Sequence, residues 1–581
     1  MKFATFGLDI TATGPVVTQS SALGEFGVDS LLAQTRGHYY LPGTLVKGLL
    51  REAMTELESL GAAWSLSDWF GQGSGDEEGT GGVDPWRGRL QIVDLLHDLP
   101  AKDDAGTRYR IRMDEQRGSV DKGAYLVIEA PFASGEQVTF RGKVRMRLKD
   151  AEDAGEVRKA LLAGLRWISA AGAERTAGFG HIHDAHVGNG SVLDLDSAVK
   201  AVPARGKAPS FLRLTLRPED PLCIAQRRVS RNLFECEEHI PGAALRGAIA
   251  AMAEGSAACE PLLDNLHLVR ITHALPANEN QPVRTPRAPL SLCRLPGHSD
   301  LQDVRLLRDA PTEFDVEPAF DIDWKKEDWD KLPSQYKTRD LDKELRVRTA
   351  IFGEARRAKD NQLFAYRVIP PGQCVWIADV DLTRITDDTT RSQVVRCLKA
   401  FEQLGLWGLG KTKACAAVTL DDSVPPVAPV IGKQGFLSVI LATPALLVDP
   451  RPLTRPLSRD EYRNLLQQAW DHQAGKGILE LFNWFQRLSL AGSHYLAERF
   501  QPSGSYRPWL LSAPGSIFVF QVNDVARAKE SVEKWLQQGL KPFGKGFYFD
   551  DDAPSQLWRN CPYIPENGYG EVRVEWTPAN S

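Results

Sequence analysis

Along this chain, blocks with the apolar and polar spacing of strands follow blocks with the spacing of helices. The opening residues, MKFATFGLDITATG, have the alternation of a strand. Pro42 and Gly43 then begin a predicted helix, whose apolar residues recur every fourth position as one buried stripe: Leu45, Leu49, Ala53 and Leu57. We expect Thr44 to cap this helix, so that its first free backbone N–H groups point outward and can hold an anion.

Two stretches rich in proline and small residues, 191–210 and 421–434, have the composition of linkers. They divide the chain into three segments: 1–200, 210–420 and 435–581. Within the second segment, residues 295–345 are highly charged and show little periodicity. We interpret this stretch as a long insertion.

The first two segments share four features in the same order, which indicates an internal repeat. Pro42-Gly43 followed by Lys47 in the first segment returns as Pro241-Gly242 followed by Arg246 in the second, at identical spacing. Each copy continues with an arginine pair, a strand that begins after a glycine, and a helix followed by a glycine-rich turn and a strand. The arginine pairs are Arg110 with Arg112 and Arg346 with Arg348.

The third segment repeats the alternation of strands and helices in a reduced form and ends in the strand-like EVRVEW. Each segment therefore has the element order of a ferredoxin-like (RRM-like) βαββαβ fold. The predicted class is α+β, with about three such modules in tandem, interrupted by insertions. Sheets of this kind commonly serve as platforms for RNA.

The composition is that of an ordinary soluble globular protein, with 43% hydrophobic and 25% charged residues. A net charge of −5 gives no overall basic excess, so any surface for nucleic acid must be local, as in the basic runs 107–112 and 346–357. The eight cysteines have no CxxC spacing, which favours reduced thiols. Without a signal peptide or an apolar run near the ~20 residues of a membrane span, we expect a soluble cytoplasmic protein without a membrane partner.

Basic residues near helix starts, on strands and in glycine-rich turns are the candidates for contacts with RNA phosphates. Lys47 and Arg51 lie one turn apart on the first predicted helix. The arginines of each pair share one strand face, which is either RNA-facing or simply solvated. The glycine turns permit close backbone approach, or they are only tight helix-to-strand turns. The candidates are Lys47, Arg51, Arg110, Arg112, Arg175, Gly178, Gly180, Arg246, Arg346, Arg348, Gly408, Gly410, Lys411 and Lys413.

Few residues suggest catalysis. Asp29 follows Val28 in a predicted loop and is either a turn residue or a lone carboxylate able to hold a metal ion. The histidines are scattered, and His38, like the others, is more typical of a structural or surface residue than of a general base. Residues 405–412 match the phosphate-loop pattern GxxxxGK with a following Thr, but a predicted helix precedes them and a strand follows, the reverse of what a P-loop requires.

The N-terminal segment resembles the RAMP-superfamily backbone subunits of type III CRISPR effector complexes. The similarity lies in GVDS at 27–30, LPGTLVKGLLR at 41–51, DWFG at 68–71, RLQIVD at 89–94 and the glycine loop ERTAGFGHI at 174–182. In that family, the aspartate of the GxD loop is needed to cut target RNA. The resemblance therefore implies that Asp29 is the catalytic residue and that it binds Mg²⁺ or Mn²⁺.

Residues 210–581 resemble the RAMP subunit of type III-D systems that holds the 5′ handle of the guide RNA. The matching stretches include HIPGAALRGAIA at 239–250, RTPRAPLS at 284–291 and GYGEVRV at 568–574. This half has no aspartate at the position that corresponds to Asp29, so no cutting is expected from it. The whole chain resembles a fusion of a backbone subunit with a handle-binding subunit.

The resemblance implies a crRNA-binding subunit of an antiviral type III ribonucleoprotein, which cuts complementary target RNA at one site through Asp29. The implied partners are the crRNA, the target RNA, other backbone RAMP subunits, the large polymerase-like signature subunit and, in some systems, a small helical subunit. Two alternatives remain open. One is a structural RNA-binding subunit without catalysis, and the other is a guide-maturation endoribonuclease that uses His or Lys and no metal.

Overall fold

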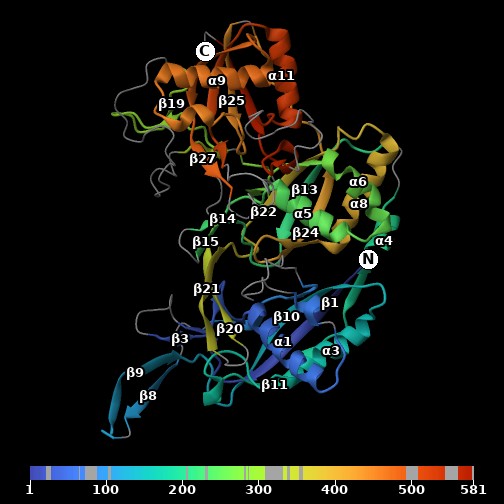
Figure 1. The fold of residues 1–581 in the computed structure, drawn as a ribbon, viewed down its shortest axis with the longest axis vertical. Coiled ribbons are helices and arrows are strands. Elements are labelled where there is room, and N and C mark those ends of the chain that lie inside the picture. The colour runs from blue at the N-terminus through green and yellow to red at the C-terminus, as the bar shows by residue number, and fades with distance from the viewer. Residues whose placement is uncertain are drawn as a thin grey trace.

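The computed structural model describes residues 1–20, 28–64, 66–71, 88–101, 106–114, 116–203, 207–228, 233–280, 283–285, 287–307, 332–336, 341–352, 357–432, 434–492, 508–543 and 560–578. They form three α+β modules that follow one another along the long axis of the molecule (Figure 1). We name them module 1 (residues 1–194), module 2 (195–422) and module 3 (435–578).

Module 1 is an eight-stranded sheet with two helices, α1 (Gly43–Ser59) and α3 (Ala154–Trp167), packed together over its core. The short α2 (Leu66–Phe70) follows α1. The strand order is β11 (His181–Val187), β1 (Lys2–Thr13), β10 (Gln137–Leu148), β7 (Leu95–Pro100), β5 (His38–Leu41) and β4 (Gln34–Thr35), while β12 (Ser191–Asp194) also pairs with β1 and β6 (Leu90–Ile92) with β10.

The packing of module 1 follows from its sequence pattern. β1 alternates as predicted, and its residues Phe6, Leu8 and Ile10 are buried in the core that the helices cover. The two helices approach closely because residue 164 is a glycine. A Cβ at Gly164 would lie 2.7 Å from Cδ1 of Leu50 on α1, so a larger residue there would push the helices apart.

The helix predicted at Pro42 is confirmed, but its buried stripe and its cap differ from the prediction. Leu45 and Leu57 are only half-buried, because a helix face drifts when residues are counted strictly every fourth position. Thr44 is exposed and does not cap the helix, since Pro42 occupies the N-cap position. The buried residues of the helix are Gly43, Val46, Leu49, Leu50, Ala53 and Met54.

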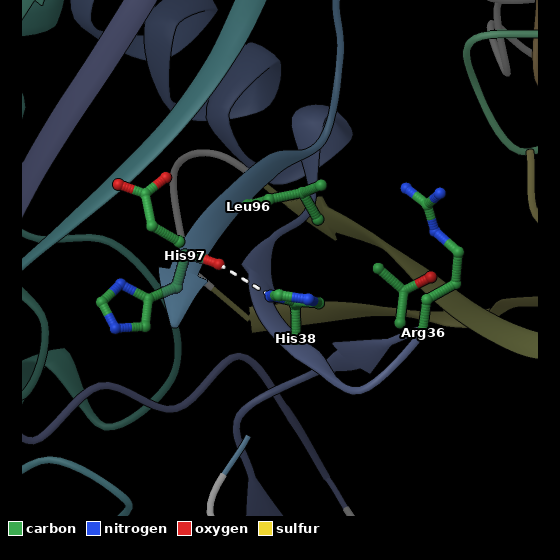
Figure 2. A pocket seen from close by; sticks show the side chains of 6 residues that line it. Arg36, His38, Leu96 and His97 are labelled. Atoms are coloured by element: carbon green, nitrogen blue, oxygen red, sulfur yellow. Dashed lines mark hydrogen bonds between the residues drawn. The ribbon is translucent and has the colours of Figure 1, made fainter. Parts of the chain in front are cut away.

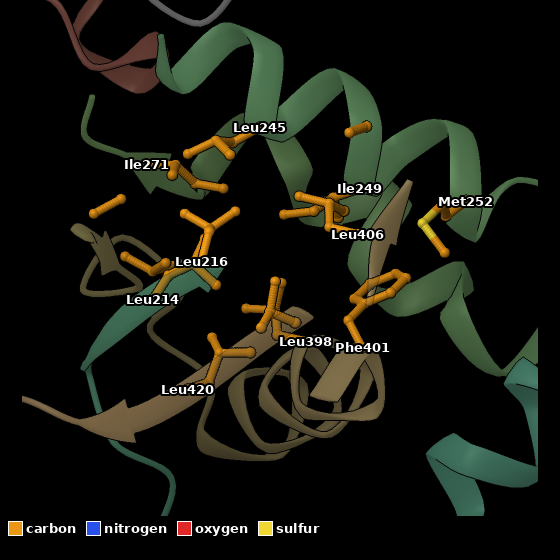
Figure 3. Close-up of a cluster of buried hydrophobic side chains, with 14 of the residues drawn as sticks. Leu214, Leu216, Leu245, Ile249, Met252, Ile271, Leu398, Phe401, Leu406 and Leu420 are labelled. Carbon is orange, nitrogen blue, oxygen red and sulfur yellow. The ribbon is translucent and has the colours of Figure 1, made fainter. Parts of the chain in front are cut away.

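Module 2 has helices α4 (Leu195–Ala201), α5 (Gly242–Ala253), α6 (Glu260–Asn265) and α8 (Asp388–Leu404). Its sheet runs β16 (Arg270–Ile271), β22 (Val375–Asp381), β13 (Phe211–Pro218), β24 (Ala414–Asp422) and β23 (Leu406–Leu409), with β17 (Leu275–Ala277) also on β22. Side chains from the helices and strands meet in one apolar core, shown in Figure 3, which includes Leu214, Leu216, Leu245, Ile249, Leu398 and Phe401.

The stretch 191–210, predicted as a linker, contains a strand and a helix. β12 pairs with β1 of module 1, while α4 packs against α8 and places Leu195, Ala198 and Val199 in the core of module 2. These three residues have helical spacing, a signal that the neighbouring proline and glycine obscured. The second predicted linker contains no helix or strand in its described residues after Asp422.

Module 3 carries α9 (Arg459–Ala474), which begins at a capping box of Ser458 and Glu461, and α11 (Val525–Gln538). Its strands lie in the order β26 (Leu479–Phe485), β29 (Ile517–Val522), β25 (Gly435–Leu441) and β30 (Val572–Pro578). By position along the chain, this is the order second, third, first and fourth strand. The central strands of modules 1 and 2 have the same order.

Modules 1 and 2 each contain a second, four-stranded sheet. In module 1 it consists of β2 (Gln19–Ser20), β3 (Ser30–Leu31), β9 (Ser119–Glu129) and β8 (Thr107–Asp114). In module 2 it consists of β14 (Ala225–Arg228), β15 (Leu233–Cys236), β21 (Arg357–Val368) and β20 (Glu344–Phe352). In both, the short strand β3 or β15 pairs in parallel with the long inner strand. Figure 1 shows that β8–β9 projects outward, whereas β20–β21 runs from module 2 onto module 1.

Two small ladders complete the described structure: β18 (Leu292–Cys293) with β19 (Gln302–Asp303), and β27 (Leu488–Ala491) with β28 (Trp509–Ser512). Of the predicted insertion at 295–345, residues 308–331 and 337–340 lie outside the described residues, and its last two residues begin β20. All eight cysteines are free of disulfides. None of the described helices has both the length and the apolar character needed to cross a bilayer.

A buried ion pair joins β20 to module 1. Arg346, only 7% exposed, pairs with Asp94 of the loop between β6 and β7, and its guanidinium lies 4.8 Å from the ring centroid of Tyr40. The other carboxylate oxygen of Asp94 accepts the N–H of Gly43 at 2.9 Å. Beside this pair, Thr35 Oγ1 donates to Glu344 at 2.8 Å. The Asp94 carboxylate thus accepts a hydrogen bond at the start of α1 and also forms the ion pair with the arginine of module 2.

We predict that Asp94→Ala destabilises the junction of modules 1 and 2 by about 3–5 kcal/mol, because Arg346 would remain buried without its carboxylate. Urea unfolding should show an earlier transition, and hydrogen exchange should accelerate at 34–41 and 344–348. The exposed pair Lys159–Glu156 supplies a control, so Glu156→Gln should leave both measurements nearly unchanged. Equal effects of the two substitutions would contradict the assigned role of Asp94.

Candidate nucleic-acid interface

Asp29 lies directly before β3 and is held against β9. Its backbone N–H donates to Val127 O at 2.8 Å, and its Oδ2 accepts the N–H of Val127 at 2.7 Å. Asp29 is nevertheless exposed. This two-point contact fixes the carboxylate at the base of the β8–β9 hairpin and leaves it accessible to a ligand. Gly27 of the same motif lies outside the described residues.

The surroundings of Asp29 limit the kind of metal site it can form. Within the described ranges, no three side chains of His, Cys, Asp or Glu lie close enough together to hold an ion. Mg²⁺ commonly keeps several waters and takes one or two protein carboxylates together with substrate phosphates. Asp29 fits that arrangement but not a cage made by protein alone. An ion at Asp29 would take its other ligands from water and RNA.

The start of α1, which we expected to hold an RNA phosphate, is occupied by the carboxylate of Asp94. Lys47 Nζ donates to Leu90 O at 2.6 Å. Burial, together with the charges of Lys413 and Arg51, lowers the pKa of Lys47 to about 8. Lys47 therefore has a structural partner, and only Arg51 of the predicted pair is fully exposed. The expected anion site at this helix start is wrong, because an internal carboxylate fills it.

The glycine turn of module 1 has an exposed tip and a packed end. Gly178, with φ 84°, has no atom within 4 Å of its Cβ position and lies on the surface. Gly180 is buried against the backbone of Ala171, where a Cβ would clash. Arg175 precedes the tip and is half-buried, and Arg110 of β8 pairs with Glu174 at the start of the turn. Gly178 can approach a phosphate backbone, whereas Gly180 is needed for packing.

The glycine turn of module 2 connects α8 to β23 and β24, so a helix precedes it, as predicted when the P-loop was rejected. Gly408 and Gly410 have φ values of 89° and 64°, and Gly410 packs against the backbone of Cys223. Lys413 O accepts a hydrogen bond from Gln91 of β6 at 2.7 Å. This turn is therefore docked on module 1, with its Lys411 side chain at the surface.

Beside this turn lies a cluster of two rings and two cations, which we call the cation–aromatic cluster. Phe234 of β15 and Tyr366 of β21 are paired in register, with ring centroids 5.4 Å apart and planes 13° from parallel. Lys411 Nζ lies 4.3 Å from the Phe234 centroid, and the Arg348 guanidinium lies 5.6 Å from that of Tyr366. Two predicted residues, Lys411 and Arg348, are thus brought to one place. Phe234 is only 8% exposed and Tyr366 is half-buried, so the cluster offers a nucleic-acid strand its two cations and part of the Tyr366 ring.

Two other predicted arginines are not available to RNA. Arg346 is buried in the ion pair with Asp94. Arg246 donates to Leu266 O at 2.8 Å and to Asn567 Oδ1 of module 3, and burial lowers its pKa. Both were predicted to contact RNA because they are basic residues at repeated positions. In the structure, both lie at junctions between modules. The side chain of Arg112 lies outside the described residues.

Aromatic residues of the interface were missed by the sequence analysis. Besides Phe234 and Tyr366, the projecting hairpin carries Tyr109 and Tyr125, which stack at 5.7 Å and are 62% and 56% exposed. The signal was present in TRYRIRMD, where arginines alternate with apolar residues and must occupy opposite faces of β8. Among the described side chains of this hairpin, the exposed apolar residues are Tyr109, Ile111, Met113, Val120 and Tyr125.

Residues 9–183 match the model of the RAMP superfamily. The match spans most of module 1, including Asp29, α1 and the first glycine turn, and agrees with the expected RAMP-type N-terminal segment. No curated protein matches the chain. The resemblance of residues 210–581 to a handle-binding subunit stays a prediction.

Solved structures that resemble the chain include two of type III-B Cmr-beta. One, bound to cognate target RNA and AMPPnP in state 1, has a chain 15% identical, with 55% of this chain and 93% of that chain covered and a TM-score of 0.29. The other, bound to cognate target RNA, has a chain 12% identical, with 57% and 96% covered and a TM-score of 0.30. Similarity at this level supports no conclusion about function.

The cation–aromatic cluster leads to a prediction about RNA affinity. Lys411→Ala should weaken binding of single-stranded RNA and reduce the slope of log K against log salt by about 0.7, the value for one lost phosphate contact on a single strand. Filter binding at several salt concentrations measures both. Lys159→Ala, on the exposed face of α3, is the matched control and should change neither. An unchanged slope for Lys411→Ala would exclude a phosphate contact at this lysine.

Proposed function

We propose that this chain is an RNA-binding subunit of a type III CRISPR effector complex, which holds a crRNA and cuts complementary target RNA through Asp29. The observation that carries the proposal is the match of residues 9–183 to the RAMP superfamily. We interpret the repeated sheet order as three ferredoxin-like modules, the first of backbone type and the other two of the type that holds a 5′ guide handle.

The guide is held mainly through its phosphates, which carry no sequence information. The exposed cations Arg51 and Lys411 and the half-buried Arg348 and Arg175 are the contacts this requires. The half-buried ring of Tyr366, which stacks on the buried Phe234, offers a surface for a base. The target is then recognised by base pairing with the guide, so the protein needs no base-specific side chains. This accounts for a chain with a net charge of −5 whose basic residues are locally concentrated.

Asp29 is the residue to which cutting is assigned. Its hydrogen bonds with Val127 hold the carboxylate in one orientation, so little ordering is needed when RNA arrives. A bound Mg²⁺ or Mn²⁺ would supply Lewis-acid stabilisation of charge on the phosphate. The adjoining hairpin, with Tyr109 and Tyr125 exposed, is placed to meet the same stretch of RNA.

Neighbouring RAMP subunits are the proposed protein partners, together with the polymerase-like signature subunit. The chain itself contains a template for such an interface, because the β20–β21 hairpin of module 2 lies on module 1 through Arg346, Asp94 and Tyr40. The corresponding β8–β9 hairpin of module 1 projects outward, with five exposed apolar residues among its described side chains. A preceding subunit that offers the same surface as module 1 would receive it.

The test is cleavage of a guide-matched RNA by the assembled complex in Mg²⁺. Asp29→Asn keeps an acceptor for the N–H of Val127 but removes the charge, so cleavage at one position should fall by about 100-fold or more while RNA affinity stays the same. Asp114→Asn is the control, because Asp114 is a carboxylate of the same hairpin that accepts backbone N–H groups. The complex that carries Asp114→Asn should cleave the RNA at the same rate as the unaltered complex.

The two outcomes separate the proposed functions. Loss of one cleavage product with intact binding supports an endoribonuclease. Retention of every product by the Asp29→Asn complex rules out catalysis by Asp29 and favours the structural RNA-binding subunit. A chain that binds neither guide nor target RNA would contradict both.

A further inference from the structure

One buried histidine lies in an aromatic stack between modules 2 and 3. His273 follows β16 of module 2 and is 1% exposed. The ring of His239, also in module 2, stacks on it, with centroids 4.8 Å apart and planes 8° from parallel. The ring of Tyr569 in module 3 meets His273 edge-on, with centroids 4.7 Å apart. His273 therefore contacts both modules through its ring.

The backbone of module 3 packs closely against this histidine. A Cβ at Gly568, whose φ is 89°, would lie only 2.5 Å from Cδ2 of His273. Arg284 Nη2 donates to His273 O at 3.0 Å, and the same guanidinium pairs with Glu571 of module 3. The residue is thus fixed from both sides, and its ring can gain space only if the two modules move apart.

The His273 ring also has an unpaired nitrogen, because Nε2 is buried without a hydrogen-bond partner among the described residues. The histidines beside the cavity of about 400 Å³ in Figure 2 differ in this respect. His38 Nδ1 lies 3.2 Å from His97 O, and His97 Nδ1 lies 3.1 Å from Thr139 O. An imidazolium has two N–H donors that need acceptors, whereas a neutral imidazole has only one. The site of His273 therefore suits the neutral ring.

The charges around His273 oppose its protonation as well. Burial lowers the pKa of His273 well below its ordinary value, and His239, Arg284 and Arg270 lower it further. A hydrogen bond to the backbone of Asn567 favours the charged ring but does not offset these effects.

The acidic groups near the stack are already paired with other residues. Glu237 Oε2 lies 3.0 Å from Nδ1 of His239, and both Asp379 and Glu571 pair with Arg284. Tyr569 stays uncharged, because burial raises its pKa. A proton on His273 would therefore add a positive charge to a site whose carboxylates are committed elsewhere.

We propose that protonation of His273 separates module 3 from module 2, so that this junction is a pH-sensitive switch in the shape of the chain. A charged ring regains water only when the backbone at Gly568 and Tyr569 moves away. The open junction then binds one proton more than the closed junction. Opening is favoured about tenfold for each pH unit below roughly 6.5, where an accessible histidine takes up its proton, and the closed junction is fully stable above that pH. This switch does not depend on the RNA-binding function proposed above.

The test is hydrogen exchange of the full chain between about pH 7.5 and pH 5.5, corrected for the intrinsic exchange rate. This range lies above the ordinary pKa of a carboxyl group, so the pairs of Arg284 stay charged. Protection of peptides covering 270–275 and 564–571 should fall about tenfold per pH unit below roughly 6.5, while that of β10 in module 1 stays constant. His273→Phe keeps a ring that cannot be protonated, so its junction should show constant protection over the whole range.

Three further variants separate His273 from other causes. His273→Asn, which is smaller and also uncharged, should match His273→Phe in having no pH dependence, even if its protection is lower throughout. His239→Phe and the matched control His38→Gln both keep His273 and should lose protection with falling pH as the unaltered chain does. Constant protection in the unaltered chain, an unchanged pH dependence in both His273 variants, or its loss in His239→Phe would overturn the proposal.

Discussion

The arrangement of the first two modules depends on the carboxylate of Asp94. One of its oxygens accepts the first helical N–H of α1, and the other pairs with Arg346 of β20. Buried charge is tolerated only when its partners satisfy it, and here the helix start and the guanidinium do so together. The docked β20–β21 hairpin then positions Glu344, which holds the turn at Thr35 and Arg36.

At the junction between modules 2 and 3, an arginine again pairs with carboxylates, but at different residues. Arg284 is 14% exposed and pairs with Glu571 of module 3 and with Asp379 of module 2. Burial alone would lower the pKa of Arg284, but these two carboxylates raise it above its ordinary value. Arg246 reaches Asn567 at the same junction. Directional pairs of this kind fix how modules meet, so the chain presents its glycine turns and hairpins in a defined order.

Much of the fold could be predicted from the sequence, because strands and helices differ in the spacing of their apolar residues. The strand at β1, the helix at Pro42 and the helix that precedes the turn at Gly405 were all predicted. The functional assignments of arginines were less reliable for a physical reason. Arg110 and Arg346 occupy repeated positions, yet Arg110 is 46% exposed on a projecting hairpin and Arg346 is buried against another module. Only tertiary contacts distinguish them, and RLQIVD at 89–94, which ends in Asp94, does not reveal that its aspartate pairs with Arg346.

The central claim is that RNA lies against the hairpin sheets of modules 1 and 2. Ultraviolet crosslinking of bound single-stranded RNA to the full chain, followed by mass spectrometry of the crosslinked peptides, tests it most directly. The account predicts crosslinks at Tyr366 and at Tyr109 or Tyr125, whose rings lie in these sheets. Crosslinks confined to the helices of module 3, with none at these three tyrosines, would contradict it.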